Sequence, residues 1–293
     1  MKIAYKNDLI FKSIYFFLIA LTGIFLSVYT SGSMIPVLSV FALLIFTILT
    51  LKKEFRRLRI VKKAFPSEWR EILVEYSKFY NCIDEKAKIR FERDIMIFLN
   101  ENSIRGIRGE ETDMTSRILV AVGVATILHG RSDWEPPFYD GVVVYPGETF
   151  DPEYNLYKGQ IAGMAGERRP MLVTKEILEK SFTDPEDGYN SLIHEIAHYF
   201  DFENPQLNGV PLIGSDYSKT EEWIGIMEKE RARVNKNESF LRSYAGSNEA
   251  EFFAVATECF FERPDIMADK NIELYKLLKN FYNLDILELF SKK

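Results

Sequence analysis

The chain has 293 residues, of which 47% are hydrophobic and 27% charged, and its formal net charge is −6. This length allows one large or two modest domains to bury a substantial core without covalent cross-links. The two cysteines, Cys82 and Cys259, lie far apart in ordinary helical patterns. A disulfide framework is therefore excluded, and a reducing compartment is favoured over secretion.

Two apolar runs stand near the N-terminus, at residues 13–29 and 34–51, and neither contains a charged side chain. Each has about the length that crosses a hydrocarbon core as a helix. A cleaved signal peptide would be followed by polar mature sequence, whereas here a second apolar run follows almost at once. We therefore predict a transmembrane helical hairpin over residues 1–63 and a separate domain over residues 64–293.

Basic side chains flank this predicted hairpin on both sides. Three lysines precede the first run, and seven lysines and arginines follow the second within residues 52–63. The positive-inside rule then predicts a multi-pass protein of the cell membrane, with everything after residue 52 in the cytoplasm and the basic flanks against anionic lipid.

The basic flank could alternatively contact nucleic acid, but the charge distribution argues against that partner. Residues 1–63 carry ten basic side chains against Asp8 and Glu54, which gives +8 there and leaves −14 for the rest of the chain. An acidic domain repels phosphate backbones, so we expect no nucleic-acid partner.

Helical spacing of apolar residues begins directly after the basic flank. Amphipathic helices are predicted over residues 67–80 and 84–102. Residues 117–128 are apolar on all sides but too few to span a membrane, which indicates a buried helix. His129 ends that segment, where we expect a packing or capping role and no part in a catalytic site.

The central part of the chain predicts a small sheet. A short strand is expected at residues 141–145, and a glycine-rich hairpin at residues 159–174. Three further helical patterns follow after residue 217. The predicted fold class is therefore α+β, a mostly helical domain with a small sheet.

The stretch SLIHEIAHYFDFEN, at residues 191–204, combines helical periodicity with a pair of histidines. His194 and His198 lie four residues apart, so one helix face presents both imidazoles to a single ion. Glu195 lies one position further round, where its carboxylate can take a proton from a metal-bound water. A pair of histidines with a purely structural role is the alternative.

A catalytic zinc of this type needs three protein ligands and an open fourth position. No histidine follows His198, so a downstream carboxylate has to complete the site. Four glutamates on the helix predicted after residue 248 are candidates: Glu249, Glu251, Glu258 and Glu262. The last three share one face at spacings of seven and four, whereas Glu249 is expected to be a solvated first-turn charge.

These motifs together resemble the Mlc titration factor A family of zinc-dependent metallopeptidases, which are glutamate-zincins. The resemblance covers about residues 65–285. It rests on four segments that occur in this order: VVVYPGETF, SLIHEIAHYFDFEN, NGVPLIG and SYAGSNEAEFFAVATECFF. It implies that the predicted α+β domain is a zincin-like metallopeptidase domain.

The resemblance also implies roles for individual residues. Zn²⁺ would be the cofactor, with His194, His198 and Glu251 as its ligands. Glu195 would be the general base. Tyr244, seven residues before Glu251, would donate a hydrogen bond to the oxyanion that develops on the substrate.

The chain departs from the family at two points. Glu249 stands where the family often has proline, and the N-terminal hairpin is an addition, so the family's repressor partner is not carried over.

We also expect Asp201, on the same helix face as His194, to accept a hydrogen bond from a ligand histidine.

The sequence thus predicts a membrane-anchored zinc peptidase that hydrolyses peptide bonds in a peptide or protein substrate. An edge strand within QIAGMA, residues 160–165, or MLV, residues 171–173, would pair with the extended substrate. The alternative is a zinc-bound regulatory module that sequesters a protein partner with little catalysis.

Overall fold

The computed structural model describes most of the chain, with gaps. The described residues are 6–29, 41–42, 45–49, 51–109, 111–132, 134–135, 140–147, 163–164, 170–201, 209–210 and 217–291. The chain divides into two compact units, Met1–Ala64 and Phe65–Lys293.

The first unit contains helices α1 (Lys6–Tyr29) and α3 (Lys52–Val61). Lys12 of α1 forms an ion pair with Glu54 of α3. Among the residues that the structure describes, no helix is both long and apolar enough to cross a membrane. The predicted transmembrane hairpin is therefore not supported by the described residues, and part of its second run, residues 34–51, lies outside them.

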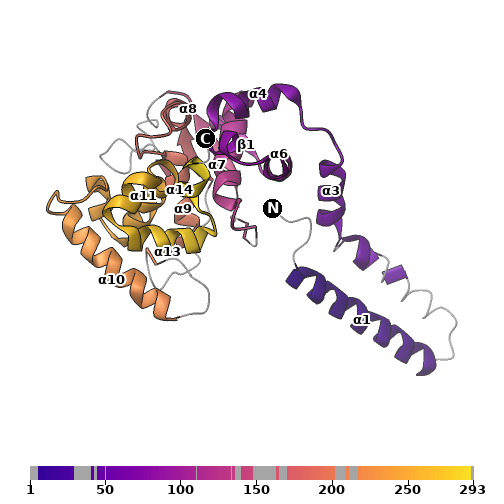
Figure 1. The fold of residues 1–293 in the computed structure, drawn as a ribbon. Coiled ribbons are helices and arrows are strands. Elements are labelled where there is room, and N and C mark those ends of the chain that lie inside the picture. The colour runs from indigo at the N-terminus through magenta and orange to yellow at the C-terminus, as the bar shows by residue number, and fades with distance from the viewer. Residues whose placement is uncertain are drawn as a thin grey trace. The chain divides into compact units, whose positions relative to one another are not determined.

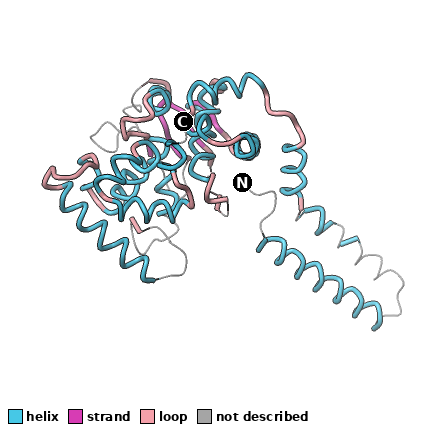
Figure 2. Tube along the Cα trace, viewed as in Figure 1, coloured by secondary structure: helices cyan, strands magenta, loops and turns pink. Residues whose placement is uncertain are grey.

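Helices form most of the second unit (Figures 1 and 2). They are α4 (Ser67–Tyr76), α5 (Lys78–Cys82), α6 (Glu85–Glu101), α7 (Met114–Leu128), α8 (Lys175–Thr183), α9 (Ser191–Asp201), α10 (Tyr217–Val234), α11 (Glu249–Glu262), α12 (Pro264–Lys270), α13 (Ile272–Tyr282) and α14 (Ile286–Ser291). Short 3-10 turns lie at η1 (Ile107–Gly109) and η3 (Ser243–Gly246). The prediction of a mostly helical domain is confirmed.

Side-chain caps explain where several of these helices begin. Asp84, Asp113, Asn248 and Asn271 each accept a hydrogen bond from the backbone N–H three residues later, at the starts of α6, α7, α11 and α13. Such caps satisfy N–H groups that have no partner within the helix. Ser77 likewise caps α5, so the predicted helix over residues 67–80 is two helices with a break.

One mixed sheet of four strands accompanies the helices. Its strands are β1 (Ile104–Gly106), β2 (Val142–Tyr145), β3 (Gly163–Met164) and β4 (Met171–Thr174), in the spatial order β1-β2-β4-β3. β2 pairs in parallel with β1 and β4, and β3 runs antiparallel to β4. The predicted strand and hairpin are present, whereas β1 was not predicted.

The order of the strands corrects one expectation. β4 contains MLV and lies between β2 and β3, so both of its sides are already paired and it is not an edge strand. β3, from the QIAGMA segment, lies at the end of the order among the described strands.

Helix α7 forms the centre of the core, as its apolar sequence predicts. Every residue from Ile118 to Leu128 is buried. Gly123 allows close packing against α9, because a Cβ atom at this position would lie 2.3 Å from Leu192 Cδ2. His129 packs against the rings of Phe79 and Phe91, at 5.2 and 6.2 Å between centroids, and burial lowers its pKa to about 3. It is a neutral core residue, as expected.

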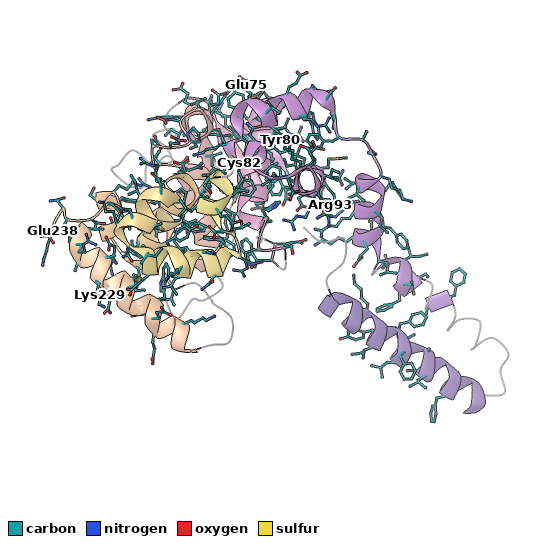
Figure 3. All side chains as sticks on the ribbon, in the orientation of Figure 1. Glu75, Tyr80, Cys82, Arg93, Lys229 and Glu238 are labelled. Carbon is teal, nitrogen blue, oxygen red and sulfur yellow. The ribbon has the colours of Figure 1, made fainter. Side chains whose placement is uncertain are left out.

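The amphipathic helices expose many of their polar residues, although Glu92 and Asp94 of α6 and Glu230 of α10 are buried. On α4 and α5, Glu75 is exposed whereas Tyr80 is buried (Figure 3). Lys229, on α10, and Glu238 are likewise exposed (Figure 3). The apolar faces of these helices therefore pack inward, which is the arrangement that their sequence periodicity predicts.

Candidate metal centre

Asparagine residues start both helices that build the centre. The side chain of Asn190 accepts a hydrogen bond from the Ile193 N–H (3.0 Å), and the backbone carbonyl of Asn190 accepts one from the His194 N–H (2.9 Å). Asn248 accepts a hydrogen bond from the Glu251 N–H in the same manner (2.9 Å). These caps fix the first turn of α9 and of α11, where His194 and Glu251 lie.

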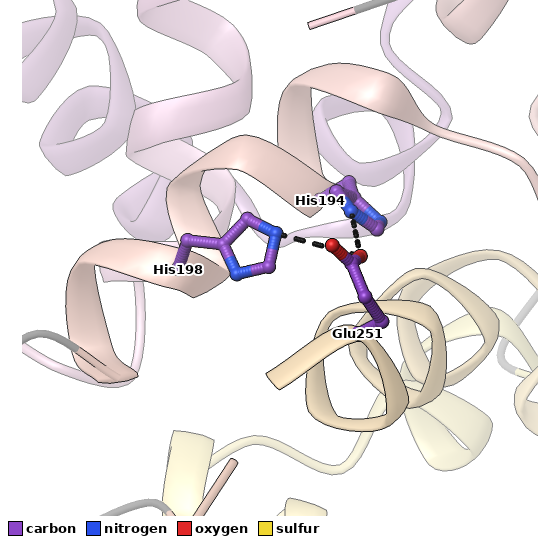
Figure 4. Close-up of side chains that lie close together, drawn as sticks. All are labelled: His194, His198 and Glu251. Carbon is purple, nitrogen blue, oxygen red and sulfur yellow. Dashed lines mark ion pairs between the residues drawn. The ribbon is translucent and has the colours of Figure 1, made fainter. Parts of the chain in front are cut away.

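The packing of α11 against α9 brings the predicted ligands together. Glu251 Oε2 lies 2.9 Å from His194 Nε2 and 3.6 Å from His198 Nε2 (Figure 4). The two imidazole rings are 4.8 Å apart and nearly perpendicular, at 82°. One atom from each of the three side chains lies within 4.8 Å of the others, so together they could hold a metal ion.

The residues fit a zinc ion by their chemistry and spacing. Ligand atoms about 2.1 Å from a tetrahedral zinc lie roughly 3.4 Å from one another, close to the two distances measured here. Glu251 Oε2, the atom that faces both histidines, is buried and lies next to the ring nitrogens of His194 and His198. A buried carboxylate is costly unless a positive charge accompanies it, and a cation at this position would supply that charge.

The electrostatics of these side chains also favour a positive charge between them. Burial alone would lower the pKa of His194, but its hydrogen bonds to Glu251 and Glu258 outweigh this and raise the pKa to about 10. Burial would raise the pKa of Glu251, but both histidines lower it well below its usual range. The carboxylates therefore favour a cation at this position.

The two residues predicted to act on substrate lie beside the ligands. Glu195 is buried on α9, and its charge contributes to raising the pKa of Tyr189, Tyr199 and Tyr244. Tyr244, on η3, is 47% exposed, and its ring centroid lies 5.9 Å from that of His194. Burial and the charge of Glu251 raise the pKa of Tyr244 to about 12, so its hydroxyl is protonated at neutral pH.

Two of the candidate carboxylates do not lie at this centre's metal-facing side. Glu258 Oε1 is 2.6 Å from Nδ1 of His194, on the side of the ring away from Glu251. Glu262 accepts a hydrogen bond from the Asn190 side-chain amide (3.0 Å). Of the three glutamates on one predicted face, the structure therefore groups only Glu251 with both histidines.

Two other expectations concern residues at the edge of the centre. Asp201 accepts a hydrogen bond from the Gly209 N–H, and the charge of His198 acts on it, whereas the carboxylate in hydrogen-bond contact with His194 Nδ1 is Glu258. Glu249 lies in the first turn of α11 and forms an ion pair with Arg231, apart from the three grouped ligands.

Arg242 is a residue of this centre that the sequence did not indicate. Its Nη2 forms an ion pair with Glu258 Oε1 and lies 3.4 Å from His194 Nδ1. Its guanidinium also lies over the rings of Tyr189 and Tyr244, at 4.6 and 5.5 Å from their centroids. Only its position two residues before Tyr244 could have drawn attention to it.

Comparison with known proteins shows the family of the chain. The chain is 24% identical to an uncharacterized protein of Synechocystis sp. over 253 residues, which cover 80% of this chain and 90% of that protein. It is 26% identical to proteins named Mlc titration factor A from Escherichia coli and Shigella boydii over 223 residues, which cover 71% of this chain and 83% of each relative. Residues 52–283 match the family described as glucose-regulated metallo-peptidase M90, and the chain belongs to this family.

Proposed function

We propose that the chain is a zinc-dependent peptidase that hydrolyses peptide bonds. One observation carries this proposal: ligand atoms of His194, His198 and Glu251 converge within 4.8 Å, and Glu195 stands between the two histidines on α9. The membership of a metallo-peptidase family supports the same reaction class.

A zinc ion held by these residues would supply an electrophile that acidifies a bound water and polarises a substrate carbonyl. Glu195 is placed to act as general base, taking the proton from the attacking water. Its carboxyl then returns the proton to the departing amine, as general acid–base catalysis requires. Its burial keeps bulk water away from this proton, which strengthens the electrostatic part of catalysis.

Tyr244 is suited to stabilise the negative charge that develops on the substrate carbonyl oxygen. A tyrosine hydroxyl is protonated at neutral pH, and the raised pKa of Tyr244 extends this to more alkaline pH, so the hydroxyl can donate a hydrogen bond throughout the neutral range. Its exposure leaves the hydroxyl accessible to a substrate on the open side of the centre.

Strand β3 supports an extended peptide as the substrate. It contacts α9 and lies at the end of the sheet among the described strands, where a substrate strand would pair with its outer side. Replacing Gly163 with proline removes a backbone donor from β3, and we expect it to raise KM with little change in kcat. An unchanged KM would exclude this binding mode.

The decisive experiment compares Glu195→Gln with wild type. We expect the variant to bind about one zinc per chain and to lose activity on a peptide library by at least about a hundredfold. Glu249→Gln is the matched control, because it makes the same change in the first turn of α11 and should retain activity. Peptidase activity that persists in Glu195→Gln would refute the proposal.

A second candidate is a regulatory module that sequesters a protein partner. The name Mlc titration factor A, carried by relatives of this chain, favours this possibility. The same variant separates the two functions, because sequestration does not need a general base. Undiminished partner binding and an undiminished biological effect in Glu195→Gln, with no cleavage by wild type, would favour the regulatory module.

A further inference from the structure

We infer that Glu258 and Arg242 form a positioning pair that holds His194 in the orientation and tautomer needed to bind the metal. This inference rests on the proposed metal centre. It assigns roles to two residues that act through His194.

The contact between Glu258 and His194 determines which ring nitrogen faces the metal. Glu258 Oε1 lies 2.6 Å from His194 Nδ1, and the Glu258 side chain is fully buried, at 0% exposure. An ionised carboxylate only accepts hydrogen bonds, so Nδ1 has to carry the proton. The lone pair of the neutral ring is then on Nε2, the nitrogen that faces Glu251.

Three donors hold the Glu258 carboxylate in place, two from the start of α9 and one from Arg242. His194 and Arg242 both approach Oε1, and the Asn190 backbone N–H donates to Oε2 at 2.8 Å. A buried carboxylate is stable only with a charge partner and satisfied oxygens, and these donors meet both needs. The carboxylate therefore cannot rotate without breaking a hydrogen bond.

Arg242 is itself held by aromatic rings on the outer side of the centre. Its guanidinium lies 4.6 Å from the centroid of Tyr189 and 5.5 Å from that of Tyr244. Cation–π contacts of this kind orient the planar group. Arg242 thus contacts both the buried Glu258 carboxylate next to His194 and the ring of Tyr244. The same guanidinium therefore helps to position a ligand histidine and Tyr244.

Glu262 provides a matched control within the same helix. It lies one turn beyond Glu258 on α11, is also buried, and contacts the same Asn190 through the side-chain amide. The contacts recorded for it do not include His194. The same glutamate-to-glutamine change at both positions therefore separates positioning of the ligand from general disturbance of the packing between α9 and α11.

The experiment measures zinc affinity of the full chain by competition with a chelator, together with the visible spectrum after cobalt replaces zinc. We expect Glu258→Gln to weaken zinc binding roughly 10- to 100-fold and to change the cobalt spectrum. Arg242→Met should have a smaller effect in the same direction, and Arg242→Lys, which keeps the charge, should partly restore affinity. Glu262→Gln should bind zinc within about twofold of wild type.

A Glu258→Gln protein with wild-type affinity and an unchanged cobalt spectrum would overturn the inference, as would equal losses in Glu258→Gln and Glu262→Gln. If Glu258→Gln does not fold, Glu258→Asp takes its place, because the shorter carboxylate keeps the charge but draws back from Nδ1. Zinc binding without Glu195-dependent cleavage would refute only the proposed peptidase, so the two failures are distinguishable.

Discussion

Helix α11 carries a glutamate near each of its two ends, and the two lie in opposite environments. At the N-terminal end, Glu251 faces two histidines, its side chain is 17% exposed, and its pKa is lowered. At the last end, Glu262 is buried beside a cavity of about 40 Å³, and burial raises its pKa to about 8. Glu258, between them, is fully buried and contacts His194 and Arg242.

The difference shows that position along one helix face does not decide what a glutamate does. His194 and His198 on α9 stabilise the charge of Glu251, whereas Glu262 has the Asn190 amide as a donor and the charges of Asp187 and Glu258 nearby. The first environment favours the charged form and the second favours the neutral form. The three carboxylates therefore differ because their partners from other segments differ.

Glutamine substitutions at the two ends test this difference most directly. We expect Glu251→Gln to weaken zinc binding roughly 100- to 1,000-fold. The apparent zinc-binding free energy of a site with about four ligands is shared among them, so losing one ligand removes roughly a quarter of it. Peptidase activity should fall with the loss of metal. Isothermal titration with zinc measures the affinity, and Glu262→Gln is the control. A Glu251→Gln protein that binds zinc as tightly as wild type would show that another group supplies the third ligand.

Glu262, at the C-terminal end of α11, should make the stability of the fold depend on pH. Burial raises the pKa of Glu262 to about 8, and the charges of Asp187 and Glu258 add to this against one hydrogen bond from Asn190. The folded state then keeps a proton that the unfolded state releases near pH 4.5, so stability falls as the pH rises from about 4.5 to about 8.

Glu262→Gln should remove this contribution, which is on the order of 3 to 5 kcal/mol across that window. Urea unfolding at pH 5 and at pH 8.5 measures it. Above pH 8 the variant should be more stable than wild type, because it buries no ionised carboxylate. Equal slopes of stability against pH in the two proteins would contradict the raised pKa.

Local patterns explain which parts of the site could be predicted. His194, Glu195 and His198 lie on one helix, so their spacing alone placed the histidines on one face. Glu251 and Glu258 shared a predicted face, and only the family resemblance favoured Glu251. Their actual roles depend on how α11 packs against α9, which helical periodicity does not contain. Arg242 acts across sixteen residues of sequence, and no local pattern indicates such a contact.

The fold likewise has parts that local sequence patterns predict and parts that they do not. Long periodic segments such as α7 and α13 were predictable because each buries a face or all sides. β1 has three residues, too few to show alternation, and the interior place of β4 depends on its pairing with β2. In the N-terminal unit, the described residues do not support a spanning hairpin, and the location of the chain in the cell stays a prediction.

Two glycines with positive φ give the smallest expected difference in stability. Gly209 packs against the N-terminal end of α11, and Gly188 lies near its C-terminal end. Gly209 has φ +69°, and a Cβ atom there would lie 2.1 Å from the backbone oxygen of Glu249. Gly188 has φ +77°, but its nearest neighbour would be Arg263 Cγ at 3.7 Å. Both substitutions to alanine introduce backbone strain, but only the first also forces backbone atoms apart.

We therefore expect Gly209→Ala to lower the free energy of unfolding by about 2 to 3 kcal/mol and Gly188→Ala by about 1 kcal/mol. Gly209 also donates to Asp201 and accepts from Trp223 Nε1 at 2.8 Å, so its displacement should loosen the end of α9 and the start of α11. Zinc affinity should accordingly fall in Gly209→Ala and stay unchanged in Gly188→Ala. Urea unfolding and chelator competition on the two variants measure both effects. Equal stability losses, or an unchanged zinc affinity in Gly209→Ala, would mean that the first end of α11 tolerates movement without disturbing the ligands.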